Sequence, residues 1–383
     1  MALKTIITYP IEVCLRLIGL WPNSSYRILQ RIFWTIVMGT CVTFQIWYCI
    51  SYFKTVDLPD LLDGLSVTLS NTITFIKLII LWFNYRKLRN ILIVVFEDWN
   101  NCALTDQNKE FMTDNLVTCS RISKFLVVIY SMTCILYSAS TMLLSDDIRE
   151  LNPNNKKLLL KMRFPFDVTI FPLYEFITIA QFAFEYSVAF MAGMLMALSA
   201  ALVLHIGSQI DIVCQELIDV SNHCEDEASY LLKRVIIKHQ RILYVSENVK
   251  YLFLYTSLVQ FISNILVMCF LGFILVNSLD TEQGPTILAK CFPYYVAVIC
   301  EAFILCYTGE YLTSKSENIN RAAYAVFWYN LNQQNSRTVL LILMGSQSPF
   351  TLTAGKFVTL CVETFANMLK VSASYISILL AMY

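Results

Sequence analysis

Residues 349–383 read PFTLTAGKFVTLCVETFANMLKVSASYISILLAMY, one long and largely apolar run without an internal proline. As a single helix it would be about 52 Å long, whereas the hydrocarbon core of a bilayer is about 30 Å thick. Lys356 and Glu363 lie in its first half, and residues 374–383 carry no charge. We therefore expect its first end to project from the membrane and the chain to end inside or at the far face of the bilayer.

The composition of the whole chain is that of a membrane protein. Of 383 residues, 57% are hydrophobic and only 15% are charged, against about 25% charged in ordinary globular domains. Basic and acidic residues balance at 28 each, which gives no sign of a nucleic-acid partner. The 13 cysteines form no C-x-x-C pair, and His205, His223 and His239 lack metal-ligand spacing. We expect no disulfide framework, metal or cofactor.

Seven apolar segments are long enough to span a bilayer. They lie at about residues 32–53, 65–83, 125–144, 171–204, 251–276 and 287–307, and within residues 349–382. A shorter apolar stretch, residues 339–344, cannot span and is expected to form a half-helix that Gly345 and Pro349 break. The prediction is an all-α membrane protein with seven transmembrane helices.

Lys and Arg are concentrated in the N-terminal segment and in the connections after the second, fourth and sixth spans. Because basic loops stay on the cytoplasmic side, the N-terminus is predicted to be cytoplasmic and the C-terminus extracellular. The loop at residues 145–170 is an exception. It is basic on the predicted outer face, with Arg149, Lys156, Lys157, Lys161 and Arg163.

The connection between the fourth and fifth spans has helical periodicity. Apolar residues recur every three or four positions from Ile206 to Val220 and again from Leu231 to Leu252. We expect cytoplasmic extensions of the flanking spans, whose apolar stripes meet each other or a neighbouring subunit; a helix lying on the membrane surface is the alternative. The expected division is residues 1–204, an anchor region at 205–250, and residues 251–383.

The C-terminal quarter also carries a motif with a known counterpart. It contains Cys306-x-x-Gly309-x-x-Leu312, Ser316, Ala323-Tyr324, Trp328-Tyr329, Pro349-x-x-Leu352-x-Ala354-Gly355-Lys356-Phe357, Thr364-Phe365 and Ser374-Tyr375. This pattern resembles the C-terminal signature of insect odorant receptors, and residues 15–22, LRLIGLWP, are similar to the opening motif of that family. The resemblance covers the whole chain. The connection between the fourth and fifth spans is short, about 46 residues, which resembles an odorant-tuning subunit and not the co-receptor.

The resemblance implies a ligand-gated, nonselective cation channel of four subunits, at least one being the co-receptor. It would lie in the plasma membrane of olfactory sensory neuron dendrites and bind a small hydrophobic odorant or pheromone, membrane lipid and permeant cations. The seventh helix would line the pore. Matched to the family pattern, the pore and gate residues are Ser374, Ile378, Ala381 and Met382, and a ring containing Ile378 would block ions by dewetting. The anchor or subunit contacts would be Tyr324, Trp328, Tyr329, Lys356, Phe357 and Phe365.

The family places its odorant pocket among the outer halves of the second, third, fourth and sixth helices. Apolar, aromatic and a few polar side chains suit such a pocket. The candidates are Asn71, Thr74, Phe75, Tyr137, Ser138, Thr141, Tyr174, Thr178, Gln181, Phe182, Tyr294, Tyr295 and Val298.

Three charged residues lie deep in the predicted spans: Lys77, Glu185 and Glu301. We expect Lys77 either to contact a carboxylate or to snorkel to the interface, and Lys370 to point sideways or into a water-filled vestibule.

Other classes fit less well. A G-protein-coupled receptor would have an outside N-terminus and Asp/Glu-Arg-Tyr after its third helix, and this chain has no such triplet. A gustatory receptor channel, a homomeric relative, is the closer alternative, but its Gln-Phe ending is replaced by Ala381-Met382. An intramembrane enzyme would need a motif such as G-x-S-x-G or H-E-x-x-H, and neither occurs. A transporter should show paired broken helices, and only one break is visible.

Overall fold

Almost all of the described chain is helical in the computed structural model. The structure describes residues 7–22, 26–101, 106–151, 158–166, 168, 172–220, 225–279, 281 and 283–382. The helices are α1 (Tyr9–Leu17), α2 (Arg27–Tyr52), α3 (Leu58–Phe83), α4 (Tyr85–Asn101), α5 (Asp106–Leu151), α6 (Leu173–Asp219), α7 (Glu225–Asn277), α8 (Gly284–Ala325), η3 (Trp328–Asn330), α9 (Gln333–Gly345) and α10 (Val362–Met382).

Seven of these helices are long and apolar enough to cross a membrane: α2, α3, α5, α6, α7, α8 and α10. They cover the first six segments that hydropathy identified to within a few residues at the ends, and α10 lies within the seventh, so the predicted fold class is confirmed. Prolines in the first turns of α3 and α8 suit those positions, where the missing N–H would have no intrahelical partner. The His223 side chain and the loop residues Lys156 and Lys157 lie outside the described residues.

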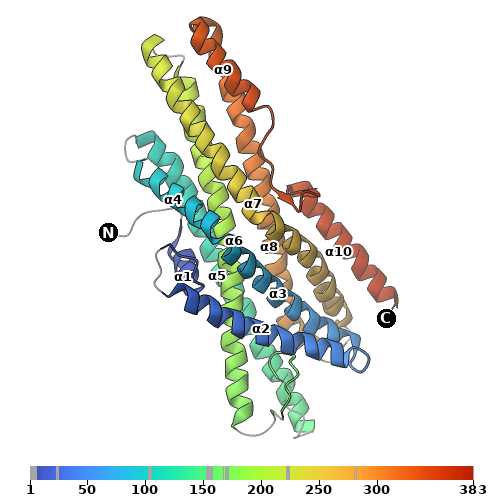
Figure 1. The fold of residues 1–383 in the computed structure, drawn as a ribbon. Coiled ribbons are helices and arrows are strands. Elements are labelled where there is room, and N and C mark those ends of the chain that lie inside the picture. Colours follow the sequence, from blue (N-terminus) through green and yellow to red (C-terminus); the bar gives the residue numbers. More distant parts are fainter. Residues whose placement is uncertain are drawn as a thin grey trace.

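Four helices are much longer than a bilayer is thick. α5 has 46 residues, α6 has 47, α7 has 53 and α8 has 42, or roughly 69, 70, 80 and 63 Å at 1.5 Å per residue. Figure 1 shows α6, α7 and α8 extending together beyond the other spans, with α9 beside α7 and α8.

The predicted extensions of the fourth and fifth spans are confirmed. α6 continues as one helix to Asp219, and α7 begins at Glu225. Their apolar stripes are buried, for example at Val213, Leu217 and Val235. A separate helix lying on a membrane surface does not form here.

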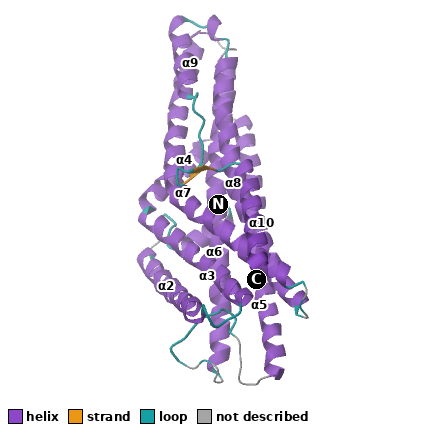
Figure 2. Ribbon diagram, turned by 90° about the vertical axis from the view of Figure 1, so that its right-hand side faces the viewer, coloured by secondary structure: helices purple, strands orange, loops and turns teal. Residues whose placement is uncertain are grey.

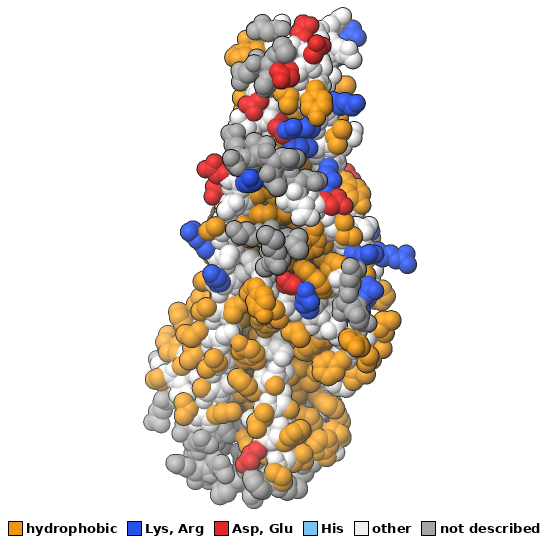
Figure 3. All heavy atoms as spheres, turned by 90° about the vertical axis from the view of Figure 1, so that its left-hand side faces the viewer, with side chains coloured by type: hydrophobic (Ala, Val, Ile, Leu, Met, Phe, Trp, Pro, Cys, Tyr) orange, Lys and Arg blue, Asp and Glu red, His pale blue; other side chains and the backbone are white. Residues whose placement is uncertain are grey.

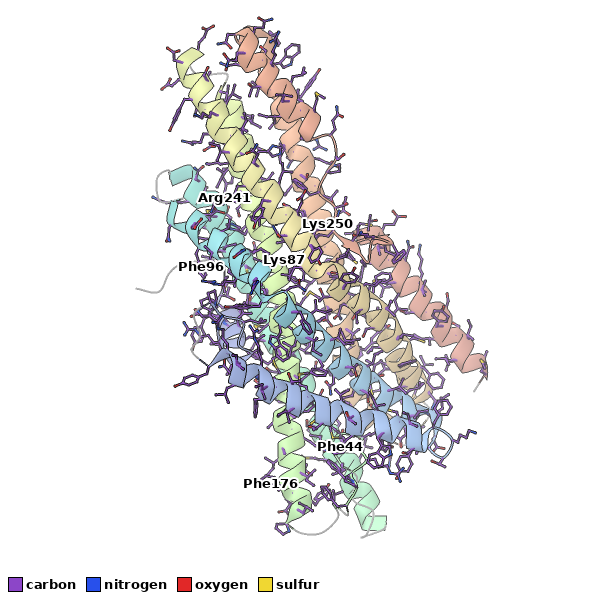
Figure 4. The ribbon with its side chains drawn as sticks, in the orientation of Figure 1. Phe44, Lys87, Phe96, Phe176, Arg241 and Lys250 are labelled. Carbon is purple, nitrogen blue, oxygen red and sulfur yellow. The ribbon has the colours of Figure 1, made fainter. Side chains whose placement is uncertain are left out.

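The surface divides along the long axis of the molecule. In Figure 3, hydrophobic side chains cover one half, while charged side chains gather over the other half. Figure 4 places Lys87, Arg241 and Lys250 on α4 and α7 toward the charged half, and Phe44 and Phe176 in the opposite half. The apolar half is therefore the part that a bilayer would surround.

The last helix is shorter than the sequence suggested. Residues 349–361 are not helical: β1 (Thr353–Ala354) pairs antiparallel with β2 (Val358–Thr359), and α10 begins only at Val362. Figure 2 shows this small hairpin beside the long helices. The prediction of one helix from Pro349 is therefore wrong, and α10 is about 31 Å long, a single bilayer crossing.

A tight turn explains this difference. Gly355 and Lys356 have φ of 61° and 66°, the left-handed conformation in which a helix cannot continue. The Gly355 N–H donates to the Leu254 carbonyl of α7 at 3.1 Å, and a side chain at Gly355 would meet Leu258. The glycine thus lets the hairpin dock closely against α7.

The half-helix predicted around residues 339–344 is present as α9. It begins earlier, after Asn332, whose side chain accepts a hydrogen bond from the Asn335 N–H at 2.8 Å, and it ends at Gly345. Such a cap supplies a partner to one otherwise unpaired N–H group.

Candidate functional site

A cavity of about 80 Å³ lies among α3, α5, α6, α7 and α8. Small apolar side chains form much of its wall, including Val67, Ile73, Val188, Ala192, Val267 and Ala297. Side chains with hydrogen-bonding groups outnumber the apolar ones among the described lining residues, and they come from all five helices. A cavity that brings apolar side chains and hydrogen-bonding groups together can hold and orient a small molecule.

Five of the predicted pocket residues line this cavity: Asn71, Thr74, Tyr137, Tyr294 and Val298. Tyr294 is fixed by two hydrogen bonds to α3, one of 2.6 Å between its hydroxyl and that of Ser70 and one of 3.1 Å to the Ser66 carbonyl. Because Tyr294 belongs to α8, these bonds join α8 to α3 at the cavity.

The other eight candidates do not line the cavity. The hydroxyls of Ser138, Thr141 and Thr178 bond to carbonyls one turn earlier on their own helices. Tyr174 supplies the carbonyl that Thr178 uses, and Gln181 bonds to the backbone of Leu160. The rings take other neighbours: Phe182 pairs with Tyr186, Phe75 faces Gly39 of α2, and Tyr295 faces Gly272 of α7.

Sequence reasoning missed the contribution of α7. Gln260 and Asn264 are 5% and 2% exposed, and both line the cavity. The Gln260 Nε2–H donates to Asn264 Oδ1 at 2.6 Å. Two amides four residues apart in an otherwise apolar span were the signal that could have found them.

The contact expected of Lys77 with a carboxylate is confirmed. Its Nζ lies 3.4 Å from Glu301 Oε1, and the two side chains are only 9% and 10% exposed. Tyr130 of α5 also hydrogen-bonds to Glu301. Lys77 therefore does not snorkel to an interface, and the pair joins α3 to α8 at the cavity wall.

A second buried ion cluster ties a loop to the helices near the cavity. Asp63 of α3 lies 2.7 Å from Lys290 of α8 and 3.0 Å from Lys161 of the loop. The Tyr137 hydroxyl, whose residue lines the cavity, donates to Asp63 at 3.3 Å. Burial alone would lower the pKa of Lys161, but the charges of Asp63 and Asp60 outweigh burial and raise that pKa above its usual range.

This cluster also accounts for part of the basic loop at residues 145–170. Lys161 is paired with Asp60 and Asp63, and the Arg163 guanidinium lies 5.2 Å from the centre of the Trp47 ring. Both basic residues are thus held by groups on α2 and α3.

The four predicted gate residues lie on the open side of α10. Ser374, Ile378, Ala381 and Met382 are all exposed, with Ile378 at 53% and Met382 at 81%. On the opposite side α10 packs on α7 and α8, and Met368 and Ser372 are its only buried residues in the described chain.

The predicted anchor residues fall into two groups. Tyr324, Trp328, Tyr329 and Phe357 are exposed aromatics, 41% to 85% exposed. Lys356 occupies the hairpin turn. Phe365 instead packs within the chain, its ring centre 5.5 Å from that of Phe303.

Seven helices that can cross a membrane, five of which surround a small internal cavity, define a helical membrane protein. The model of the 7tm odorant receptor family matches residues 57–373, and the chain belongs to that family.

The chain is 26% identical to Odorant receptor 85b of Drosophila melanogaster over 155 residues, which cover 40% of this chain and 39% of that relative. It is 22% identical to Odorant receptor 13a of the same fly over 426 residues, covering 98% and 96%. The structure of the olfactory receptor OR5 from Machilis hrabei in complex with eugenol matches the fold with a TM-score of 0.82, at 16% identity and 97% coverage of both chains.

Proposed function

We propose that this protein is the odorant-tuning subunit of a heterotetrameric, ligand-gated, nonselective cation channel that it forms with the odorant receptor co-receptor. It would lie in the plasma membrane of olfactory sensory neuron dendrites, with its N-terminus inside. An odorant would bind in the cavity among α3, α5, α6, α7 and α8, and α10 would line the pore. Membership of the odorant receptor family supports the receptor role.

The observation that carries the channel proposal is the exposure of α10. In the 18-residue stretch of each helix that is apolar enough to cross a membrane, only 11% of α10 is buried within the chain, against 78% of α6. Asn367, Lys370, Ser374 and Ser377 are all exposed and recur at spacings of three and four, so they form one polar stripe opposite the packed face. A polar stripe on a membrane-crossing helix faces water or protein more readily than lipid.

Ile378 lies beside this stripe, about 12 Å along the helix from Lys370. In a ring of four subunits, an apolar residue at that position can close the pore by dewetting. Lys370 would then face a wider vestibule, which keeps its charge away from the narrowest point.

The cavity and α10 are joined through α8 and α7. Tyr294 lines the cavity, and the next residue, Tyr295, lies against Gly272 of α7. On α10, Ile376 fills the space directly over Gly272. A ligand that moves α8 would therefore change the packing beneath Ile376 and could rotate or tilt α10.

The test is whole-cell current in cells that express this chain with and without an insect odorant co-receptor, over a broad odorant panel. We expect a ligand-evoked cation current only when both subunits are present. Current from this chain alone would contradict the tuning-subunit assignment and favour a homomeric channel of the gustatory type. Surface labelling in both conditions controls for expression, and a known tuning subunit controls for the co-receptor.

A further inference from the structure

Among the described residues, three acidic or basic side chains line the cavity, and two of them neutralise each other. Lys77 and Glu301 form an ion pair, and Tyr130 adds a hydrogen bond to Glu301. The third is Glu185 of α6. The cavity therefore holds one carboxyl group more than it holds basic groups.

Glu185 has no basic partner within ion-pair distance in the part of the chain that the structure describes. Its hydrogen-bond partner is the Asn71 amide, at 3.1 Å, and that amide also reaches Gln45 at 3.4 Å. An ionisable residue inside a membrane helix is costly, and such residues usually pair with another group or line a functional site. Glu185 lines the cavity, so a ligand there is positioned to be that group.

The remaining walls suit a cation attached to a short hydrocarbon. Tyr130, Tyr137 and Tyr294 line the same cavity as Glu185, and tyrosine rings attract ammonium groups through their electron-rich faces. Valine, isoleucine and alanine side chains provide apolar surface, while serine, threonine, asparagine and glutamine side chains add further hydrogen-bonding groups.

Two polar atoms on residues that line the cavity are unpaired. Gln260 Oε1 and Asn264 Nδ2 are buried without a hydrogen-bond partner in the described part of the chain. Such unpaired groups are unfavourable in an apolar interior, and a purely hydrocarbon ligand could not pair them. A ligand with hydrogen-bonding atoms that reaches these amides, or water that accompanies it, would pair them.

We propose that the cavity selects a small protonated aliphatic amine, with Glu185 as its counter-ion. The proposal rests on the ligand-binding role proposed above and specifies the ligand class. A primary ammonium group both neutralises Glu185 and donates three hydrogen bonds. An alcohol can donate only one and leaves the charge unpaired, while a carboxylic acid would place a second negative group beside Glu185.

The experiment compares propylamine with propan-1-ol, two ligands that differ only in the head group and are small enough for a cavity of about 80 Å³. Binding is measured on the purified full-length chain in lipid nanodiscs, from the dependence of the thermal unfolding midpoint on ligand concentration. Propylamine is expected to bind more tightly than propan-1-ol. Glu185→Gln should weaken propylamine by about 30-fold or more, as expected for loss of one partner of a desolvated charge pair, and change propan-1-ol by less than about threefold.

Two variants control this result. Glu175→Gln makes the same chemical change on an exposed residue in the first turn of α6 and should leave both ligands unaffected. Glu185→Asp keeps the charge on a shorter side chain and should retain preference for the amine. It also provides a second test of the charge, should the Gln variant fold poorly.

The outcomes separate this proposal from the channel proposal. Equal loss of both ligands in Glu185→Gln, or no preference for propylamine in the unaltered chain, would overturn the amine assignment without affecting the channel proposal. Amine binding that depends on Glu185, without any current in co-expressing cells, would support the amine site and count against the channel.

Discussion

α6 and α10 both cross the membrane, yet they relate to the chain in opposite ways. In the 18-residue apolar stretch of each helix, 78% of α6 is buried inside the protein and only 11% of α10. α6 packs among α5, α7 and α8, whereas α10 rests on one side of α7 and α8. A helix buried on all sides by its own chain is structural core, whereas one with a broad open face needs lipid, water or other subunits to cover it.

The difference predicts that core changes affect folding, while changes on the open face of α10 affect conduction. The largest effect is expected at the buried ion pair. Lys77→Met would leave Glu301 charged and without its lysine, which typically costs about 3–5 kcal/mol. Denaturant unfolding of the purified chain should show this loss.

A double variant and a matched control sharpen that experiment. Lys77→Met with Glu301→Gln removes both charges and should recover most of the stability, because no unpaired charge remains. Lys370→Met removes an exposed lysine from α10 and should change unfolding by less than about 0.5 kcal/mol. If Lys370→Met were as damaging as Lys77→Met, the contrast between core and α10 would be wrong.

A smaller loss is expected where α8 supports the hairpin. A side chain at Gly309 would collide with the backbone of Leu360, just before α10. Gly309→Leu should therefore destabilise the chain by about 1–3 kcal/mol through overpacking. Thermal unfolding and surface expression would both report it.

Ala366→Leu is the matched control for that change. It adds a similar volume to the exposed side of α10 and should alter the stability of the chain by less than about 0.5 kcal/mol. A normal unfolding midpoint for Gly309→Leu would refute the close contact between α8 and the hairpin.

Substitution of Ile378 is expected to change the stability of the chain least and yet to change the current through the channel strongly. Because Ile378 is 53% exposed, Ile378→Ser should change the unfolding free energy by less than about 0.5 kcal/mol. A serine would wet the constriction, so whole-cell recording should show a standing current without ligand. Leu380→Ser, at another exposed position of α10, is the control. A standing current in that variant and not in Ile378→Ser would show that the gate is assigned to the wrong residue.

Hydropathy could predict the seven spans because each has an apolar run long enough for a bilayer. The periodicity of apolar residues could also predict the extensions of α6 and α7, since these residues repeat at helical spacing from Ile206 to Val220 and again from Leu231 to Leu252. Hydropathy missed the hairpin before α10, where two residues with positive φ interrupt an apolar run that otherwise reads as helix. A turn set by two backbone angles leaves no trace in hydropathy.

The cavity was predictable only in part. Polar and aromatic residues in the outer half of a span were predicted to line the pocket, and on this basis the prediction included Asn71, Thr74 and Tyr137, which line the cavity. Gln181 was included on the same basis, but its amide bonds to the Leu160 backbone in a loop that no periodicity describes. Which face of each helix meets the cavity depends on how the helices are rotated against one another, and one sequence does not state those rotations.

The most direct test of the central claim asks whether the polar stripe of α10 meets the ion path. Ser374→Cys and Leu380→Cys are each expressed with the co-receptor and exposed to a water-soluble, charged thiol reagent during ligand-evoked current. The unaltered chain, co-expressed and treated in the same way, shows whether the reagent acts on the native cysteines. We predict progressive block of the Ser374→Cys channel and no change for Leu380→Cys. Block at Leu380→Cys with no effect at Ser374→Cys would contradict the assignment of the exposed face of α10 to the pore.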